Sequence, residues 1–184
     1  KKISRLDLDD PSDLRLLQAR NLTMLAGWGV RCWELVRKHR ENIRRRITPN
    51  RHYMDRAEEF ISARRSEADR VIGVLIRQSD YRTWNEGQYY FDTTRYTEWI
   101  DEINRRMDGD NVFVVASEVQ QPTEPFDDIP SVFATGEAVG EGHYLESFAE
   151  LSLCDLVVTP PSTFSTLAAF LGDVPIVPLY RGVE

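Results

Sequence analysis

The sequence predicts an α/β fold, a doubly wound parallel sheet, over residues 70–184. Val71–Ile76 is a near-continuous apolar run, as expected of a strand buried on both faces of a parallel sheet. Further short apolar runs alternate with amphipathic segments long enough for right-handed βαβ crossovers. The 184 residues suffice for one substantial hydrophobic core or two small ones. Near residue 70 the sequence pattern changes from charged helical segments to apolar, strand-like runs.

Before residue 70, helical patterns dominate. Asn21–Val30 is a short apolar run, which we interpret as a strand that ends in a turn. Cys32–Ile47 predicts a charged amphipathic helix, and Tyr53–Arg65 predicts a second one. The two acidic residues of Asp7–Asp9 lie just before a proline, and we interpret them as part of a turn.

After residue 70, strands alternate with helices. A helix over Thr93–Met107 has an apolar stripe, and Thr93 or Thr94 can cap it. The elements expected after it are a strand at Asn111–Ala116, a short strand at Ser131–Ala134, a helix at Tyr144–Leu153, a strand at Leu156–Thr159, a helix at Thr163–Leu171 and a strand at Pro175–Leu179. Ligands of doubly wound sheets bind outside the carboxyl ends of the strands, so we expect site residues there.

The composition argues against several classes of protein. No stretch approaches the ~18 apolar residues of a membrane span, and the first residues contain no apolar run like a signal peptide. Cys32 and Cys154 lack metal-ligand spacing, so we expect no metal site and, with unpaired cysteines, a cytoplasmic protein. The absence of GxGxxG after a strand and of GxxxxGK[ST] argues against a dinucleotide-binding site and a P-loop ATPase.

The charges are unevenly distributed along the chain. Residues 1–70 contain 17 Lys and Arg against 11 Asp and Glu, whereas residues 71–184 contain 6 against 19. We interpret the basic runs Arg37–Arg40 and Arg44–Arg46 as the solvated face of a helix, and we expect no nucleic-acid partner. An anionic ligand after residue 70 must therefore be held by a well-placed arginine and by backbone amides.

Two strand ends carry candidate anion-binding groups. Arg77 leaves the first buried strand at its carboxyl end, where a guanidinium can hold a phosphate or carboxylate with two hydrogen bonds. A loop ion pair between Arg77 and Asp80, without any ligand, explains the same spacing equally well. The fourth strand runs through two prolines into Ser162–Ser165, where the hydroxyls and the free N–H groups of a helix start can bind an anion; helix capping explains one of these hydroxyls.

At these strand ends the sequence resembles the inverting, GDP-fucose-using fucosyltransferases of the GT-B fold, most closely the bacterial α-1,2-fucosyltransferase branch. Three positions of the family's run HxRRGDY are matched, by Arg77, Asp80 and Tyr81. Leu75 replaces the histidine, Gln78 the second arginine and Ser79 the glycine. The later STFS motif of the family is matched at Ser162, Thr163, Phe164 and Ser165.

The resemblance implies a GT-B type fold and a set of donor-binding residues. Residues 70–184 would form the Rossmann-like donor domain, and residues 1–69 the end of the N-terminal acceptor domain with linking helices. Arg77 would bind the β-phosphate and stabilise the charge on the departing nucleotide. The residues implied to contact the donor are Arg77, Asp80, Tyr81, Glu146, Ser162, Thr163, Phe164 and Ser165; Glu146 lies one position before the place of a purine-reading acidic residue, which Ser147 occupies.

The function implied is an inverting, metal-independent glycosyltransferase that transfers fucose from GDP-fucose to a glycan hydroxyl. We expect no cofactor besides the nucleotide-sugar donor, and the sequence indicates no oligomeric state. A GT-B enzyme needs two Rossmann-like halves, so we expect this chain to be a fragment. Two alternatives remain open: a non-catalytic nucleotide-sugar or glycan-binding module of the same fold, and an α/β nucleotide-binding protein of another kind.

Overall fold

The computed structural model describes residues 6–19 and 30–181, and the chain forms two compact units, Lys1–Ile47 and Thr48–Glu184. The units divide before residue 70 because helix α4 (Arg51–Arg65) packs against helix α6 (Tyr144–Leu153) of the sheet-containing unit. Ala57 and Ile61 of α4 are buried in this packing. The helix before the first buried strand therefore belongs with that strand rather than with the residues that precede it.

The first unit consists of short elements: β1 (Leu6–Asp7), α1 (Pro11–Gln18), β2 (Val30–Arg31), α2 (Trp33–Lys38) and α3 (Arg40–Ile47). Strands β1 and β2 pair in parallel. The single helix predicted over Cys32–Ile47 is wrong, because His39 leaves the helical conformation between α2 and α3. The turn expected at Asp7–Asp9 begins at the end of β1, and the carboxylate of Asp9 accepts the N–H groups of Glu34 and Leu35 at the start of α2. The strand predicted at Asn21–Val30 lies outside the described residues except for its last position.

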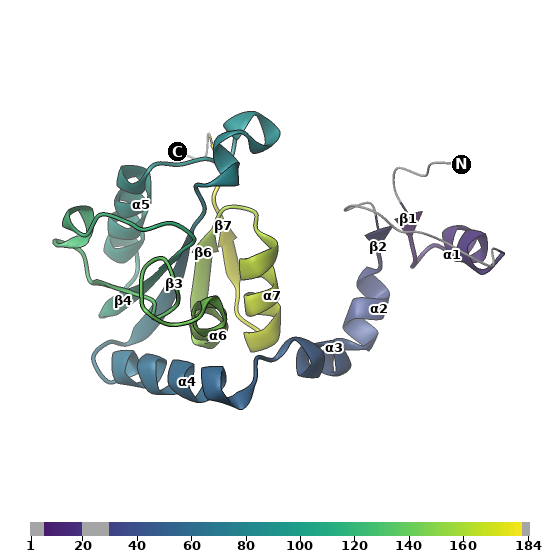
Figure 1. The fold of residues 1–184 in the computed structure, drawn as a ribbon, viewed down its shortest axis with the longest axis horizontal. Coiled ribbons are helices and arrows are strands. Elements are labelled where there is room, and N and C mark those ends of the chain that lie inside the picture. The colour runs from purple at the N-terminus through teal and green to yellow at the C-terminus, as the bar shows by residue number, and fades with distance from the viewer. Residues whose placement is uncertain (1–5, 20–29, 182–184) are drawn as a thin grey trace. The chain divides into compact units, whose positions relative to one another are not determined.

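The second unit is built on a five-stranded sheet in which every strand pairing is parallel, with the order β5-β4-β3-β6-β7 (Figure 1). The strands are β3 (Arg70–Ile76), β4 (Asn111–Ser117), β5 (Ser131–Phe133), β6 (Leu156–Thr159) and β7 (Ile176–Pro178). Each lies within two residues of its predicted bounds. Because β3 and β4 are buried along almost their whole length, their apolar runs identified them from sequence.

Helices cover both faces of this sheet (Figure 1). Helix α5 (Thr93–Arg106) packs its apolar side on one face, with Tyr96, Trp99 and Ile100 buried. On the other face lie α4, α6 and α7 (Thr163–Gly172). Asp92 caps α5 by accepting the N–H of Arg95, so the cap predicted at Thr93 or Thr94 is wrong. The doubly wound arrangement predicted from the sequence is confirmed.

The order of the strands creates a switch point beside β3. The chain moves from β3 to β4 and β5 on one side, and β6 and β7 then form on the other side. Connections that leave in opposite directions open a crevice at the carboxyl ends of β3 and β6, where doubly wound sheets bind their ligands. Two short 3₁₀ helices, Asp80–Arg82 and Trp84–Gly87, follow β3 at this end, and α7 begins there after β6.

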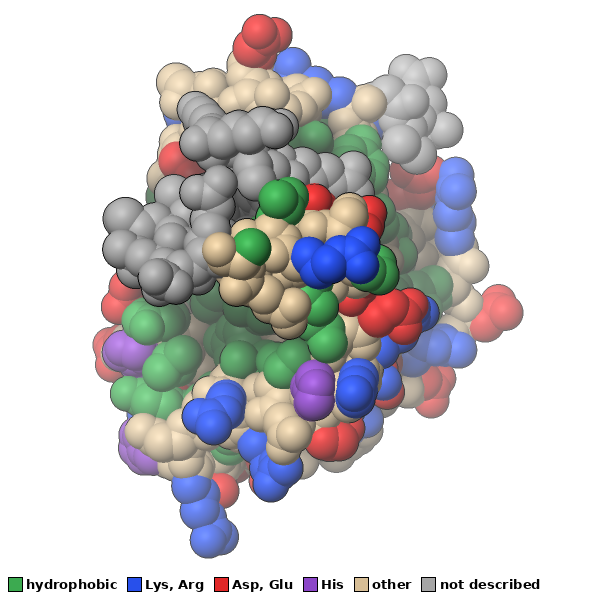
Figure 2. Space-filling view, turned by 90° about the vertical axis from the view of Figure 1, so that its right-hand side faces the viewer, with side chains coloured by type: hydrophobic (Ala, Val, Ile, Leu, Met, Phe, Trp, Pro, Cys, Tyr) green, Lys and Arg blue, Asp and Glu red, His purple; other side chains and the backbone are tan. Residues whose placement is uncertain are grey.

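Figure 2 shows Lys and Arg side chains of the described residues among acidic and apolar ones. Within the helices α2 and α3, Arg37 pairs with Glu34 and Arg44 with Glu41, each one turn away. The exposed Arg37, Arg45 and Arg46 fit the interpretation of the basic runs as solvated helix faces, whereas the Arg44 side chain is only 18% exposed. Among the residues that the structure describes, no helix has the length and apolar character needed to cross a membrane.

Candidate functional site

A cavity of about 230 Å³ lies at the carboxyl ends of β3 and β4, on the face covered by α6 and α7. Leu75 and Arg77 line it from the end of β3, and Glu118 follows directly on β4. The complete lining consists of Leu75, Arg77, Ala116, Ser117, Glu118, Glu137, Tyr144, Ser147 and Phe164. The cavity thus combines an apolar wall with one guanidinium and two carboxylates, in the region that the topology marks for ligands.

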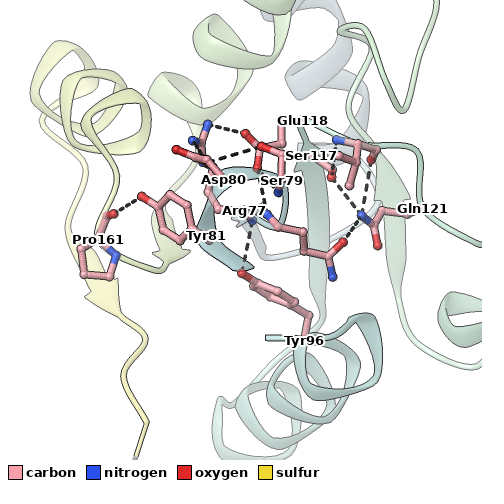
Figure 3. Close-up of polar contacts among 11 residues, drawn as sticks. Arg77, Ser79, Asp80, Tyr81, Tyr96, Ser117, Glu118, Gln121 and Pro161 are labelled. Atoms are coloured by element: carbon pink, nitrogen blue, oxygen red, sulfur yellow. Dashed lines mark hydrogen bonds and ion pairs between the residues drawn. The ribbon is translucent and has the colours of Figure 1, made fainter. Parts of the chain in front are cut away.

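Arg77 lies at the centre of a polar network (Figure 3). Its Nη1 is 2.6 Å from Oε2 of Glu118, and its Nη2 is 3.0 Å from Oδ1 of Asp80. The guanidinium also stands 4.9 Å from the centre of the Tyr81 ring. Its Nε is buried and has no hydrogen-bond partner among the described residues. The loop pair with Asp80 considered from the sequence is therefore present, and a second carboxylate joins it.

Glu118 is a site residue that the sequence did not indicate. Besides its ion pair with Arg77, its Oε1 accepts the backbone N–H groups of Gln78 and Ser79 at 2.8 and 2.9 Å. The register of the sheet explains the contact, because Ile76 pairs with Ser117 and the next residues leave the strands side by side. Its position directly after a buried strand was the available sequence signal.

Tyr81 joins the two loops at the switch point (Figure 3). Its hydroxyl donates a hydrogen bond to the carbonyl of Pro161, in the turn between β6 and α7. Burial raises the pKa of this hydroxyl, so it stays protonated as a donor. The structure thus brings together the two strand ends that the sequence singled out, and Tyr81 is the side chain that connects them.

The hydroxyls at the start of α7 differ in their surroundings. Ser162 stands at the N-cap position of α7, but its side chain makes no capping hydrogen bond. The hydroxyl of Ser165 is fully buried, lies 2.9 Å from Oγ1 of Thr159 and donates to the carbonyl of Ser162 at 3.2 Å. Thr163 is exposed at the first position of the helix. The backbone of the helix start, more than the Ser165 hydroxyl, is thus placed to meet a ligand.

The apolar wall of the cavity carries one unpaired hydroxyl. Phe164 packs edge-on against Phe148 and lines the cavity together with Leu75. Ser147 also lines it, and its buried Oγ has no hydrogen-bond partner among the described residues. Leu75 presents an aliphatic group to the cavity, at the position where the family that the sequence resembles has a histidine.

Glu146 lies beneath the cavity wall rather than in it. Its side chain is 2% exposed and forms an ion pair with Arg56 at 3.1 Å. It accepts the hydroxyl of Thr135 at 2.9 Å and the N–H of His143 at 3.3 Å, which completes a capping box at the start of α6. Beside it, Glu150 is fully buried, and burial raises the pKa of its carboxyl. These contacts give Glu146 a structural role, and they hold the loop that carries Glu137.

Gln78, which stands at the place of the family's second arginine, points away from the cavity. Its Nε2 donates to the carbonyl of Phe91, and its Oε1 accepts from Gln121 at 3.0 Å. The site therefore contains one arginine side chain from the matched run. Among the described residues, no group of three or more His, Cys, Asp or Glu side chains is arranged to hold a metal ion.

Comparisons with known proteins show the fold of this chain. No family model and no curated protein sequence matches it. POFUT1 in complex with GDP-fucose aligns over 73% of this chain and 47% of its own, with a TM-score of 0.51 and 17% identity. POFUT1 in complex with GDP aligns over 71% and 46%, with a TM-score of 0.50 and 17% identity. KpsC of Thermosulfurimonas dismutans, a beta Kdo 2,7 transferase, aligns over 78% and 48%, with a TM-score of 0.38 and 16% identity.

This chain thus spans just under half the length of each of these structures. At such low identity the likeness to POFUT1 concerns the fold alone. The α/β fold of GT-B type, with a parallel Rossmann-like sheet, is confirmed.

Proposed function

We propose that this chain supplies the donor-binding half of a glycosyltransferase that transfers fucose from GDP-fucose to a hydroxyl of a glycan acceptor. The observation that carries the proposal is the switch-point crevice, where Arg77 at the end of β3 meets the turn before α7 through Tyr81. A guanidinium and a helix start are two of the groups that proteins use to hold a diphosphate. The GDP-fucose bound to POFUT1, a structure of the same fold, supports this choice of donor.

The cavity suggests how the donor lies. The diphosphate would sit between Arg77 and the first N–H groups of α7, with Asp80 orienting the guanidinium. The nucleobase would lie against the apolar wall near Phe164, where the unpaired hydroxyl of Ser147 can bond to its polar edge. In this arrangement Glu146 acts indirectly, by holding the loop beside the base.

The proposed reaction is a displacement with inversion. The acceptor hydroxyl attacks C1 of the sugar from the side opposite the diphosphate. The bond between C1 and the β-phosphate oxygen breaks, and its electron pair stays with the diphosphate. Arg77 would stabilise that charge, an effect of several kcal/mol in comparable sites. The hydroxyl proton passes to a general base of the acceptor-binding half. In this proposal no metal ion takes part.

Titration calorimetry with GDP, UDP and ADP, combined with a donor-hydrolysis assay, tests the proposal. We expect GDP to bind more tightly than UDP or ADP, and slow release of fucose from GDP-fucose that a chelator does not inhibit. Binding of none of the three nucleotides would refute the proposal. Strong inhibition by the chelator would refute its metal-independent mechanism.

A non-catalytic nucleotide-sugar or glycan-binding module is the second candidate. Two observations favour it: the charge of Arg77 is already matched by Asp80 and Glu118, and Leu75 replaces a polar group in the cavity wall. The first reduces the positive charge available to a leaving diphosphate, and the second removes a polar contact to the donor. GDP binding without any release or transfer of the sugar by the protein that contains this chain would support this candidate over the enzyme.

A further inference from the structure

The carboxylate of Glu118 is bound by a set of donors that suits a phosphoryl group. Its Oε1 accepts the neighbouring N–H groups of Gln78 and Ser79, at 2.8 and 2.9 Å. Its Oε2 lies 2.6 Å from Nη1 of Arg77. Consecutive backbone N–H groups beside a guanidinium bind phosphate oxygens in many proteins. We call these three donors the Glu118 seat. Arg77, which supplies one of them, and Glu118 itself both line the cavity.

While the Glu118 carboxylate occupies the Glu118 seat, the site is electrostatically unfavourable for an anion. One guanidinium faces two carboxylates, those of Asp80 and Glu118, so the group carries a net negative charge. A diphosphate that approaches Arg77 meets the like charge of Glu118 directly. The Glu118 side chain is only 20% exposed, so solvent screens this repulsion less than it would at an open surface.

The present arrangement also leaves Arg77 incompletely paired. Its Nε is buried and has no hydrogen-bond partner among the described residues. A buried donor without an acceptor costs free energy, so the contact with Glu118 does not satisfy this guanidinium fully. A phosphoryl group offers three acceptor oxygens and more charge than a carboxylate, and it can pair with Nε when the guanidinium turns.

We propose that the Glu118 carboxylate competes with the ligand for the three donors of the Glu118 seat. A phosphoryl group of the nucleoside diphosphate must displace this carboxylate in order to bind Arg77. The proposal rests on the proposed function, because its ligand is the diphosphate of that donor. Carboxylate and phosphoryl group occupy the seat in turn: the first holds Arg77 and the loop after β3 in place while the site is empty, and the second replaces it on binding.

The substitution Glu118→Gln separates competition from a purely supporting role. The amide oxygen of glutamine can still accept the N–H groups of Gln78 and Ser79, so the loop keeps its support, but the competing charge is gone. We expect pyrophosphate and GDP to bind about tenfold more tightly to this variant at low ionic strength. The gain should shrink as salt is added.

The matched control is Glu137→Gln, which removes a carboxylate from the same cavity. Among the described residues, Glu137 forms no ion pair with Arg77, so its removal should change the affinity much less. Arg77→Ala should lose the binding of both probes, pyrophosphate and GDP.

In amide NMR spectra of the wild-type protein, the signals of Gln78 and Ser79 should move when pyrophosphate is added, because the acceptor of their N–H groups changes.

The outcomes distinguish the two proposals. Tighter binding to Glu118→Gln than to both the wild type and Glu137→Gln supports the competition. Equal or weaker binding to Glu118→Gln, in a protein whose wild type binds GDP through Arg77, overturns the competition and leaves the proposed function intact. Failure of the wild type and all variants to bind GDP or pyrophosphate overturns the proposed function together with this inference.

Discussion

Arg77 shows what a single residue's position in the sequence can and cannot tell. Its place at the end of an apolar run predicted a cation at the carboxyl edge of the sheet, and the structure has it there. Its partner Glu118 is forty-one positions further on, and the pair depends on the register between β3 and β4. Patterns within one segment carry no information on that register, so the ion pair could not be predicted.

The first prediction concerns Arg77→Ala. We expect this variant to lose donor binding and transfer, because the β-phosphate loses its guanidinium partner. The effect on folding should be small, about 1 kcal/mol, since Asp80 is exposed and Glu118 keeps the N–H groups of Gln78 and Ser79 as partners. Calorimetric titration and thermal unfolding measure the two effects. Arg82→Ala, in the same loop and exposed, is the control, and equal activity of Arg77→Ala and the control would exclude the proposed role.

Ser165 offers a prediction in which sequence and structure point to different roles. The motif predicts a hydroxyl that contacts the donor, whereas the buried contacts with Thr159 and the carbonyl of Ser162 indicate support of the turn. From the contacts we expect Ser165→Ala to lower the free energy of unfolding by about 1 kcal/mol. Thr163→Ala, at an exposed position, should not. A loss of GDP affinity without any loss of stability would instead favour the role that the motif predicts.

Glu150 should make the stability of the protein depend on pH. Burial raises the pKa of its carboxyl, with the negative charge of Glu146 adding to the effect and Arg56 and Thr135 opposing it. The neutral form is therefore favoured in the folded state. Its contribution to stability is complete below the pKa of the unfolded chain and is lost as the pH rises through the raised pKa.

We therefore expect Glu150→Gln to gain stability relative to the wild type as the pH increases. Urea unfolding at about pH 5 and about pH 8 measures the difference. The exposed Glu141→Gln is the control and should follow the wild type at both pH values. A stability difference that does not change with pH would contradict a raised pKa of Glu150.

At the scale of elements, the strands and helices after residue 70 were predicted well because each carries a periodic signal. Continuous apolar runs marked β3 and β4, and three-to-four spacing marked α5. Helix α1 and the break at His39 were missed. Caps and local bends leave no periodic signal in the sequence by which they could be recognised. Helix α4 was found, but its packing on α6 could not be predicted, since it is a tertiary contact.

The packing of α6 on β3 depends on a glycine. A Cβ atom at Gly73 would lie 2.6 Å from Cδ2 of Leu151 and 3.1 Å from Sγ of Cys154. Gly73→Ala should therefore push the helix from the sheet and lower the free energy of unfolding by about 1–3 kcal/mol. Denaturant unfolding measures the loss. Ser131→Ala, on the short strand β5, is a control that enlarges no side chain and should cost less.

At the scale of the whole molecule, the strand order brings the separate signals to one place. The two strand ends singled out from the sequence lie about eighty residues apart, and the parallel order with β3 beside β6 puts them on the same edge of the sheet. That meeting could be predicted, because carboxyl ends of parallel strands share an edge. The inward direction of Ser165 and the capping contacts of Glu146 could not be, because they depend on side-chain packing that no motif records.

The central claim is that a nucleoside diphosphate binds at the switch point between β3 and β6, and a crystal structure with GDP bound tests it most directly. We predict that the diphosphate oxygens contact the guanidinium of Arg77 and the first N–H groups of α7, with the base against the wall formed by Phe164. GDP bound away from the carboxyl ends of these strands, or an empty crevice at saturating GDP, would contradict the account.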